Sequence, residues 1–315
     1  MASYCVTRTE EFFLSDLRAW TDCQDSPRRD ITDVLATLRW WRWLHLKSGG
    51  ASPYAVGRSV EPEAYWGENS GERFHRNKWA KYARGRHKPS ERTLLNADRV
   101  FPGSAKEYRL AIWEILKRPP QSATSVAAMA SKLEAAVARQ VVLWLSDEER
   151  FSGESTDHLV GALECVASMD SLGGLMLVCY SALNAGQVKV ARDLVRGIYR
   201  IAQLLGPELL MLGVARPFMD LLEQRFLCHA VYDGRRWFMS ANAYMTTVAF
   251  LSFHSQGPSC AEPKAAMRAI LDAGDPDLDC RAPLAPALVP ANSVEWNNLG
   301  GARLRREATL GESPD

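Results

Sequence analysis

"WAKYARGRHKPSERTLLNADRVF", residues 79–101, is the stretch whose pattern most clearly indicates a local fold. Trp79 and Tyr82 are three residues apart, so on a helix they share one face. Gly85 can adopt the left-handed conformation that ends a helix without a steric penalty. Ser90 can then accept a hydrogen bond from the first turn of a second helix. The stretch therefore predicts two short helices joined by a basic loop.

This stretch lies in the most basic part of the sequence. Residues 73–92 contain eight Lys and Arg and a single acidic residue, Glu91, although the net charge of the whole chain is only +1. Residues 1–120 contain 21 Lys and Arg against 15 Asp and Glu, whereas the remaining residues contain 17 against 22. A compact excess of positive charge favours an anionic partner such as a nucleic acid.

If Trp79 and Tyr82 face inward, the polar side chains around them face outward. Asn and Arg near the start of a helix can read base edges, and nearby Lys and Arg can hold phosphates. The predicted nucleic-acid-binding residues are Arg76, Asn77, Lys78, Lys81, Arg84, Arg86 and Lys88. Two alternatives stay open, a solvated basic surface and a surface that docks another protein.

The same residues resemble the end of a lambda-repressor-like (XRE-type) helix-turn-helix domain. In that family a recognition helix ends with an aromatic residue and a glycine, a basic loop with proline follows, and the next helix carries paired leucines. The matching positions are Trp79, Tyr82, Gly85, the loop Arg86–Pro89, Leu94, Leu95 and Phe101. The resemblance implies DNA binding and transcription regulation.

The resemblance extends over roughly residues 34–103. "LRWWRWLHLKSGGASPYAVGRSV", residues 38–60, is similar to the first helix of the family, its glycine turn and its second helix. Ala55 and Ser59 are then expected near the tight crossing of the helices. Ala83 is a departure, because the family usually has glutamate at that position.

A second departure is an insertion at residues 61–75, between the second and third helices of the resemblance. Its segment "YWGENSGERF" contains turn residues between aromatic ones, which predicts a small β-hairpin near residues 65–74. Such a hairpin could act as a wing beside the DNA or could disturb docking.

Apolar residues at helical spacing dominate the chain, and strict two-residue alternation is almost absent. We therefore predict an all-α fold with a helix-turn-helix-like domain in residues 1–120 and a helical bundle in residues 121–273. A tail rich in Pro and Ala follows in residues 274–315. The boundary is "RPPQSAT", residues 118–124, where two prolines stop a helix.

Finer expectations concern individual helices. The helix that follows Asp30 should bury Val34, Leu35, Leu38 and Trp41 or Arg42. In the bundle we expect one long helix that buries residues from Met129 to Trp144, a break at Gly173-Gly174, a kink at Pro217 and a final helix over residues 235–254.

The sequence offers no sign of catalysis. It has no H-E-x-x-H spacing, no Walker loop, no G-x-S-x-G and no dinucleotide fingerprint, so we expect no enzyme, no catalytic residues, no metal and no cofactor. The seven cysteines are scattered and form no C-x-x-C pair, which favours reduced thiols and a cytoplasmic location. Charges interrupt the most apolar region, residues 159–183, so we expect no membrane partner.

The leading interpretation is a DNA-binding regulatory protein whose partner is duplex DNA. The rival is a non-enzymatic helical protein-interaction factor that keeps a degenerate helix-turn-helix fold and does not bind DNA. In either case the C-terminal bundle could form a homo-oligomer, bind a protein partner or sense a small ligand.

Overall fold

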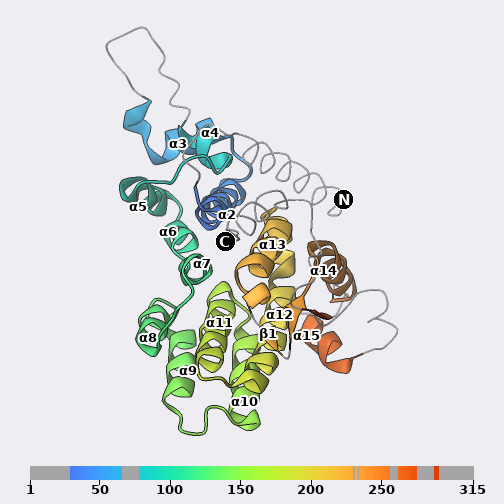
Figure 1. Cartoon of the computed structure of the whole chain (residues 1–315). Coiled ribbons are helices and arrows are strands. Elements are labelled where there is room, and N and C mark those ends of the chain that lie inside the picture. Colours follow the sequence, from blue (N-terminus) through green and yellow to red (C-terminus); the bar gives the residue numbers. More distant parts are fainter. Residues whose placement is uncertain are drawn as a thin grey trace, which may run out of the picture.

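A computed structural model describes residues 29–65, 78–229, 231–232, 234–255, 262–274 and 287–290. Regular structure in these residues is almost entirely helical, which confirms the predicted all-α fold (Figure 1). The N-terminal part contains α2 (Ile31–Lys47), α3 (Pro53–Val60), α4 (Lys78–Ala83), α5 (Glu91–Val100), α6 (Ser104–Tyr108) and α7 (Ala111–Lys117). The bundle contains α8 (Ala123–Ala130), α9 (Ala135–Ser146), α10 (Gly153–Val166), α11 (Met169–Asn184), α12 (Val188–Met211), α13 (Ala215–Arg225), α14 (Ala241–Ser255) and α15 (Pro263–Ala273).

Two 3₁₀ turns and one small sheet complete the described structure. The turns are η1 (Pro62–Ala64) and η2 (Leu227–His229), and the strands are β1 (Val231–Tyr232), β2 (Arg235–Phe238) and β3 (Ala287–Pro290). The strands pair antiparallel in the order β1-β2-β3. The β-hairpin predicted near residues 65–74 lies outside the described residues except for Tyr65, which is in a turn.

α2 contributes to two hydrophobic cores, one packed against its N-terminal half and one against its C-terminal half. Asp30 caps the helix by accepting a hydrogen bond from the backbone N–H of Thr32. Val34 and Leu38 are buried in a large core shared with the bundle. Trp41, nearer the C-terminal end, is buried in a smaller core within the N-terminal part. These burials confirm the predicted inward face of the helix.

The large core continues across the predicted boundary at residues 118–124. Ile112 and Ile115 of α7 are fully buried in it, and Ile115 lies against Gly173 of α11. The linker itself runs between α7 and the side-chain cap of α8, Ser122. The division into residues 1–120, 121–273 and 274–315 stays a prediction that fragmentation experiments can test.

Ion pairs reinforce the contacts of α2 with its neighbouring helices. The Arg39 side chain is only 3% exposed, and its guanidinium binds Glu107 of α6 and Glu208 of α12, both at 2.6 Å. Two further pairs join Asp33 to Lys117 of α7 at 2.6 Å and Asp30 to Arg225 of α13 at 3.3 Å. α2 and its capping residue are therefore tied to four neighbouring helices, α6, α7, α12 and α13.

Two expected features of the bundle are wrong. The long helix expected after residue 124 is two helices, α8 and α9, and the break between them lets Leu133 turn into the core. Gly173 and Gly174 do not end a helix but lie inside α11. Their lack of side chains lets α7 and α9 pack closely, because a Cβ at Gly174 would lie 3.0 Å from Val141.

The predicted kink at Pro217 is also wrong, since the chain breaks earlier. α12 runs through Pro207 to Met211, and a turn with Gly213 at φ +64° separates it from α13. Pro217 lies in the first turn of α13, where a missing N–H interrupts no helical hydrogen bond.

The expected final helix over residues 235–254 is correct only in its later part. Its first residues form β2, whose Trp237 is buried, and α14 begins at Ala241. α15 and β3 were not expected, and β3 comes from the segment predicted to be a tail. Residues 275–286 and 291–315 of that segment lie outside the described residues.

Candidate nucleic-acid interface

α4 is anchored by the two aromatic residues that the sequence places inward. Trp79 is 1% exposed and Tyr82 is 3% exposed, which confirms their predicted orientation. The ring of Trp79 stacks on Trp40 of α2 with centroids 5.9 Å apart, and Tyr82 meets Trp40 edge-on at 5.7 Å. Stacked and edge-on aromatic pairs add to the free energy gained by burying their apolar area. The opposite side of α4 is therefore the side available for a partner.

The crossing of α3 and α4 depends on a different residue from those expected. Ala55 and Ser59 are exposed, so their expected place at the tight crossing is wrong. Gly57 lies there instead, because Val56, Gly57 and Val60 form the buried face of α3. A Cβ at Gly57 would lie 2.4 Å from Cδ1 of Trp79. Glycine at this position therefore permits the close approach of the two helices.

Glu61 links the three helices that surround the predicted contact surface. Its two carboxylate oxygens accept hydrogen bonds from Nζ of Lys78 at 2.8 and 2.9 Å, and Oε1 also accepts one from Thr93 of α5 at 3.3 Å. The Lys78 side chain is half-buried in this arrangement. Lys78 was predicted to face outward toward phosphates, but its charge is compensated by Glu61.

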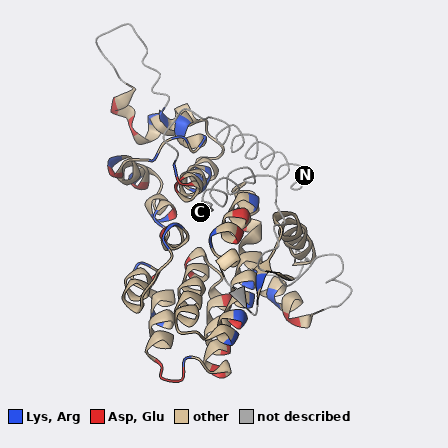
Figure 2. Cartoon of the chain, viewed as in Figure 1, with Lys and Arg blue, Asp and Glu red and all other residues tan. Residues whose placement is uncertain are grey.

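The remaining described cations of the predicted set are exposed. Lys81, Arg84, Arg86 and Lys88 all lie on or just after α4, and none of the four forms an ion pair with any residue in the described part of the chain. We call these four residues the basic surface. Figure 2 shows Lys and Arg of α4 in blue. Arg76 and Asn77, the other two predicted contacts, lie outside the described residues.

His87 lies in this loop, near two cations. Burial and the positive charges of Lys81 and Arg29 lower the pKa of the His87 imidazole below its ordinary value. Burial is the larger cause of the lowered pKa, and repulsion from the two cations adds to it. An anionic ligand would relieve that repulsion.

The basic loop begins with a defined helix ending. Gly85 has φ +65°, as its predicted role requires, and the N–H groups of Gly85 and Arg86 donate to the carbonyls of Tyr82 and Lys81 at 2.9 and 2.8 Å. This pair of bonds is the Schellman motif. Ser90 caps α5 by accepting a hydrogen bond from the N–H of Thr93, as predicted. The loop between the two helices is thus fixed at both ends.

The paired leucines of the resemblance have different environments. Leu94 is buried in the smaller core, whereas Leu95 is 48% exposed. Phe101, the expected closing apolar residue, is partly buried against the same core. One of the two leucines therefore serves the packing that the resemblance implies.

Sequence reasoning missed three residues that shape this interface: Gly57, Glu61 and Arg29. Gly57 could have been found from the spacing of Val56 and Val60, which places it on the buried face. The role of Arg29 had no local signal, because its guanidinium donates to the carbonyl of Gly85, 56 residues away.

No protein-family model, curated protein or solved structure matches this chain. The helix-turn-helix resemblance therefore rests on the residues described above and stays a prediction. Among the described residues no helix is both long and apolar enough to cross a bilayer. The same part of the chain holds no group of three or more His, Cys, Asp or Glu that could ligate a metal.

Proposed function

We propose that this protein is a DNA-binding regulatory protein that contacts duplex DNA through the basic surface. The observation that carries the proposal is the exposure of Lys81, Arg84, Arg86 and Lys88, without ion-pair partners among the described residues, beside a helix anchored by buried aromatic rings. Lys and Arg on a rigid support suit phosphate contacts. A cytoplasmic location and transcription regulation belong to the same proposal.

The basic surface sets the expected salt dependence of binding. Four phosphate contacts release about four counterions, so the slope of log affinity against log salt concentration is about −3.6. Affinity then falls roughly 100-fold between 50 and 200 mM salt. The measurement is a titration of fluorescently labelled genomic duplex fragments with the full chain at several salt concentrations.

Variants of the basic surface test which residues make the contacts. Replacing Lys81 and Arg84 together by alanine should weaken binding to all fragments alike and reduce the magnitude of the slope by about two. Arg139→Ala is the matched control, because Arg139 is an exposed cation on α9 in the bundle. No detectable binding at 50 mM salt, or an equal loss with Arg139→Ala, would reject the proposal.

One observation favours a protein contact made by the bundle, which is the role of the rival protein-interaction factor and is also compatible with DNA binding. Val142 and Leu143 are adjacent on α9 and are 50% and 56% exposed. Exposed apolar side chains in a bundle can form a homo-oligomer or a protein contact. Replacing both by serine and comparing the sedimentation of the two proteins tests this use of the bundle. An unchanged monomer in both samples would argue against self-association.

A further inference from the structure

We infer that Arg29 is a positioning residue for the basic surface and sets its affinity for DNA phosphates without contacting the DNA. This inference rests on the proposed function. It concerns a residue outside the basic stretch, on the chain segment that leads into α2.

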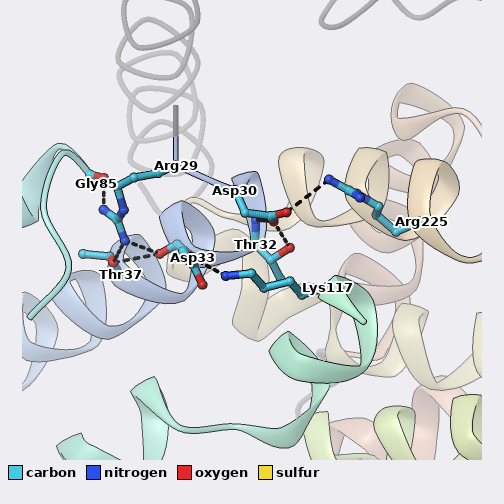
Figure 3. A network of polar contacts seen from close by, with 8 residues as sticks. All are labelled: Arg29, Asp30, Thr32, Asp33, Thr37, Gly85, Lys117 and Arg225. Atoms are coloured by element: carbon cyan, nitrogen blue, oxygen red, sulfur yellow. Dashed lines mark hydrogen bonds and ion pairs between the residues drawn. The ribbon is translucent and has the colours of Figure 1, made fainter. Parts of the chain in front are cut away.

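Three hydrogen bonds hold the guanidinium of Arg29 (Figure 3). Nη1 donates to the carbonyl of Gly85 at 2.5 Å, and Nη2 donates to the carbonyl of Asp33 at 2.9 Å and to Oγ1 of Thr37 at 3.0 Å. Both terminal nitrogens therefore point into the protein. The terminal nitrogens of Arg29 donate to acceptors within the protein, so other cations are left to bind phosphates.

The carbonyl of Gly85 lies at the C-terminal end of α4, where a hydrogen bond from a cation is favourable. Carbonyls at and beyond the last turn of a helix lack an intrahelical partner, and a cationic donor there is favoured by the helix dipole as well. Gly85 lies between Arg84 and Arg86, two residues of the basic surface. The carbonyl of Gly85 belongs to the peptide group that leads into Arg86, so fixing this carbonyl fixes the direction in which Arg86 and the loop after it leave α4.

Apolar contact with α2 holds one side of the turn at Gly85. A Cβ at Gly85 would lie 2.8 Å from Cγ1 of Val34 and 3.1 Å from Cγ of Leu38, so the bare backbone rests directly on α2. The bond from Arg29 adds a directional constraint to that contact. Loss of the bond leaves the peptide group between Gly85 and Arg86 held only on its N–H side, by the bond from Arg86 to the carbonyl of Lys81.

Helices α7 and α13 in turn define the position of Arg29. Asp30 and Asp33, which lie in the same turn of chain, bind Arg225 of α13 and Lys117 of α7 (Figure 3). The connection therefore runs from α7 and α13 through the start of α2 to Gly85. An arginine suits this position because its planar fork can hold several acceptors at once, whereas a lysine donates from one point.

A double-mutant cycle in DNA affinity tests the inference. Arg29→Met is measured in the full chain and again in a chain carrying Arg86→Ala and Lys88→Ala, by titration of labelled genomic duplex fragments at 50 mM salt. If Arg29 acts through the loop, Arg29→Met weakens binding about tenfold in the first background, since a charge-assisted hydrogen bond is lost. In the second background the loss should be less than about twofold, because the groups it positions are gone.

Arg29→Lys separates position from charge and serves if Arg29→Met does not fold. It keeps the positive charge but donates from a single nitrogen, which cannot reproduce the two donor positions of Nη1 and Nη2. It should therefore also weaken binding in the first background and much less in the second. Wild-type affinity in Arg29→Lys, or equal losses in both backgrounds, overturns the inference and leaves the proposed function standing. Absence of DNA binding by the unaltered chain overturns both.

Discussion

Gly57 of α3 rests against the indole of Trp79 in α4, so closely that a Cβ on Gly57 would lie 2.4 Å from Cδ1 of the ring. The contact joins the two helices that the insertion at residues 61–75 separates in sequence. In place of a tight turn, the crossing is held by this approach and by the ion pair between Glu61 and Lys78.

Gly57→Ala should destabilise the protein, although alanine is the better helix former. The added methyl group would overlap a buried ring that cannot move without disturbing Trp40, so we expect a loss of about 1–3 kcal/mol in the free energy of unfolding. Gly161→Ala is the matched control, because Gly161 lies in α10 with no atom within 4 Å of the added Cβ. That variant should gain roughly 0.5–1 kcal/mol. Urea denaturation of both variants provides the measurement, and a stabilised Gly57→Ala would contradict the packing.

Trp79→Ala should cost about 3–5 kcal/mol of unfolding free energy, because it leaves a cavity in the smaller core. Lys81→Ala, on the exposed side of the same helix, should change stability by less than about 0.5 kcal/mol but weaken DNA binding. The pair is measured by chemical denaturation, with a DNA titration of Lys81→Ala. If Trp79→Ala did not change the stability, α4 would be rotated from this orientation. If Lys81→Ala changed neither stability nor DNA binding, the basic stretch would be an ordinary solvated surface.

Local signals in the sequence predicted much of this region. Spacing placed Trp79 and Tyr82 inward, and conformational preference placed Gly85 at the end of α4. These features depend on a few neighbouring residues, so one sequence contains them. The bonding of Lys78 to Glu61 could not be predicted, because the partner is 17 residues away across the insertion.

The failed predictions share a physical cause. Glycine pairs and prolines usually interrupt helices, but Gly173 and Gly174 remain helical because α7 and α9 pack against them. Pro217 is compatible with the first turn of α13, so the break falls at Gly213 instead. In each case tertiary contacts or the position within the helix override the local preference of the residue.

Limited proteolysis should cut the linker at residues 118–124, where Gln121 and Ser122 are exposed, and yield fragments that end near residue 120 on a denaturing gel. The nicked protein should nevertheless elute as one species in native size-exclusion chromatography, because α2 and α7 share the large core with the bundle. Thermolysin is suitable, since proline after Arg118 blocks trypsin. Two separating fragments would show that the parts fold and move independently.

Arg39→Met should destabilise the protein by about 2–4 kcal/mol, because it leaves Glu107 half-buried and without its cation. The loss stays below that of a fully buried pair, since the second partner, Glu208, is 38% exposed. Combining Arg39→Met with Glu107→Gln should recover part of the loss, because the stranded charge is removed. Lys106→Met is the control: its pair with Glu134 is exposed on both sides and should contribute less than about 1 kcal/mol. Equal losses for Arg39→Met and Lys106→Met in urea denaturation would contradict the buried role of Arg39.

Asp220 of α13 should make stability depend on pH in a direction opposite to that of most carboxylates. Burial raises the pKa of the Asp220 carboxyl to about 6, against the opposing effect of Arg216, and its Oδ2 has no hydrogen-bond partner among the residues that the structure describes. A raised folded-state pKa means that the folded protein binds the proton more tightly than the unfolded chain. The stabilising contribution is therefore present below pH 4 and is lost as the pH rises through about 6.

Asp220→Asn removes this titration, so the free energy of unfolding of the variant should match that of the wild type near pH 4 and exceed it by about 1–3 kcal/mol at pH 8. Urea denaturation of both proteins across that range measures the difference, with the exposed Asp157→Asn as control. A difference between Asp220→Asn and wild type that does not change with pH would mean that water solvates the carboxylate and that burial does not govern its ionisation.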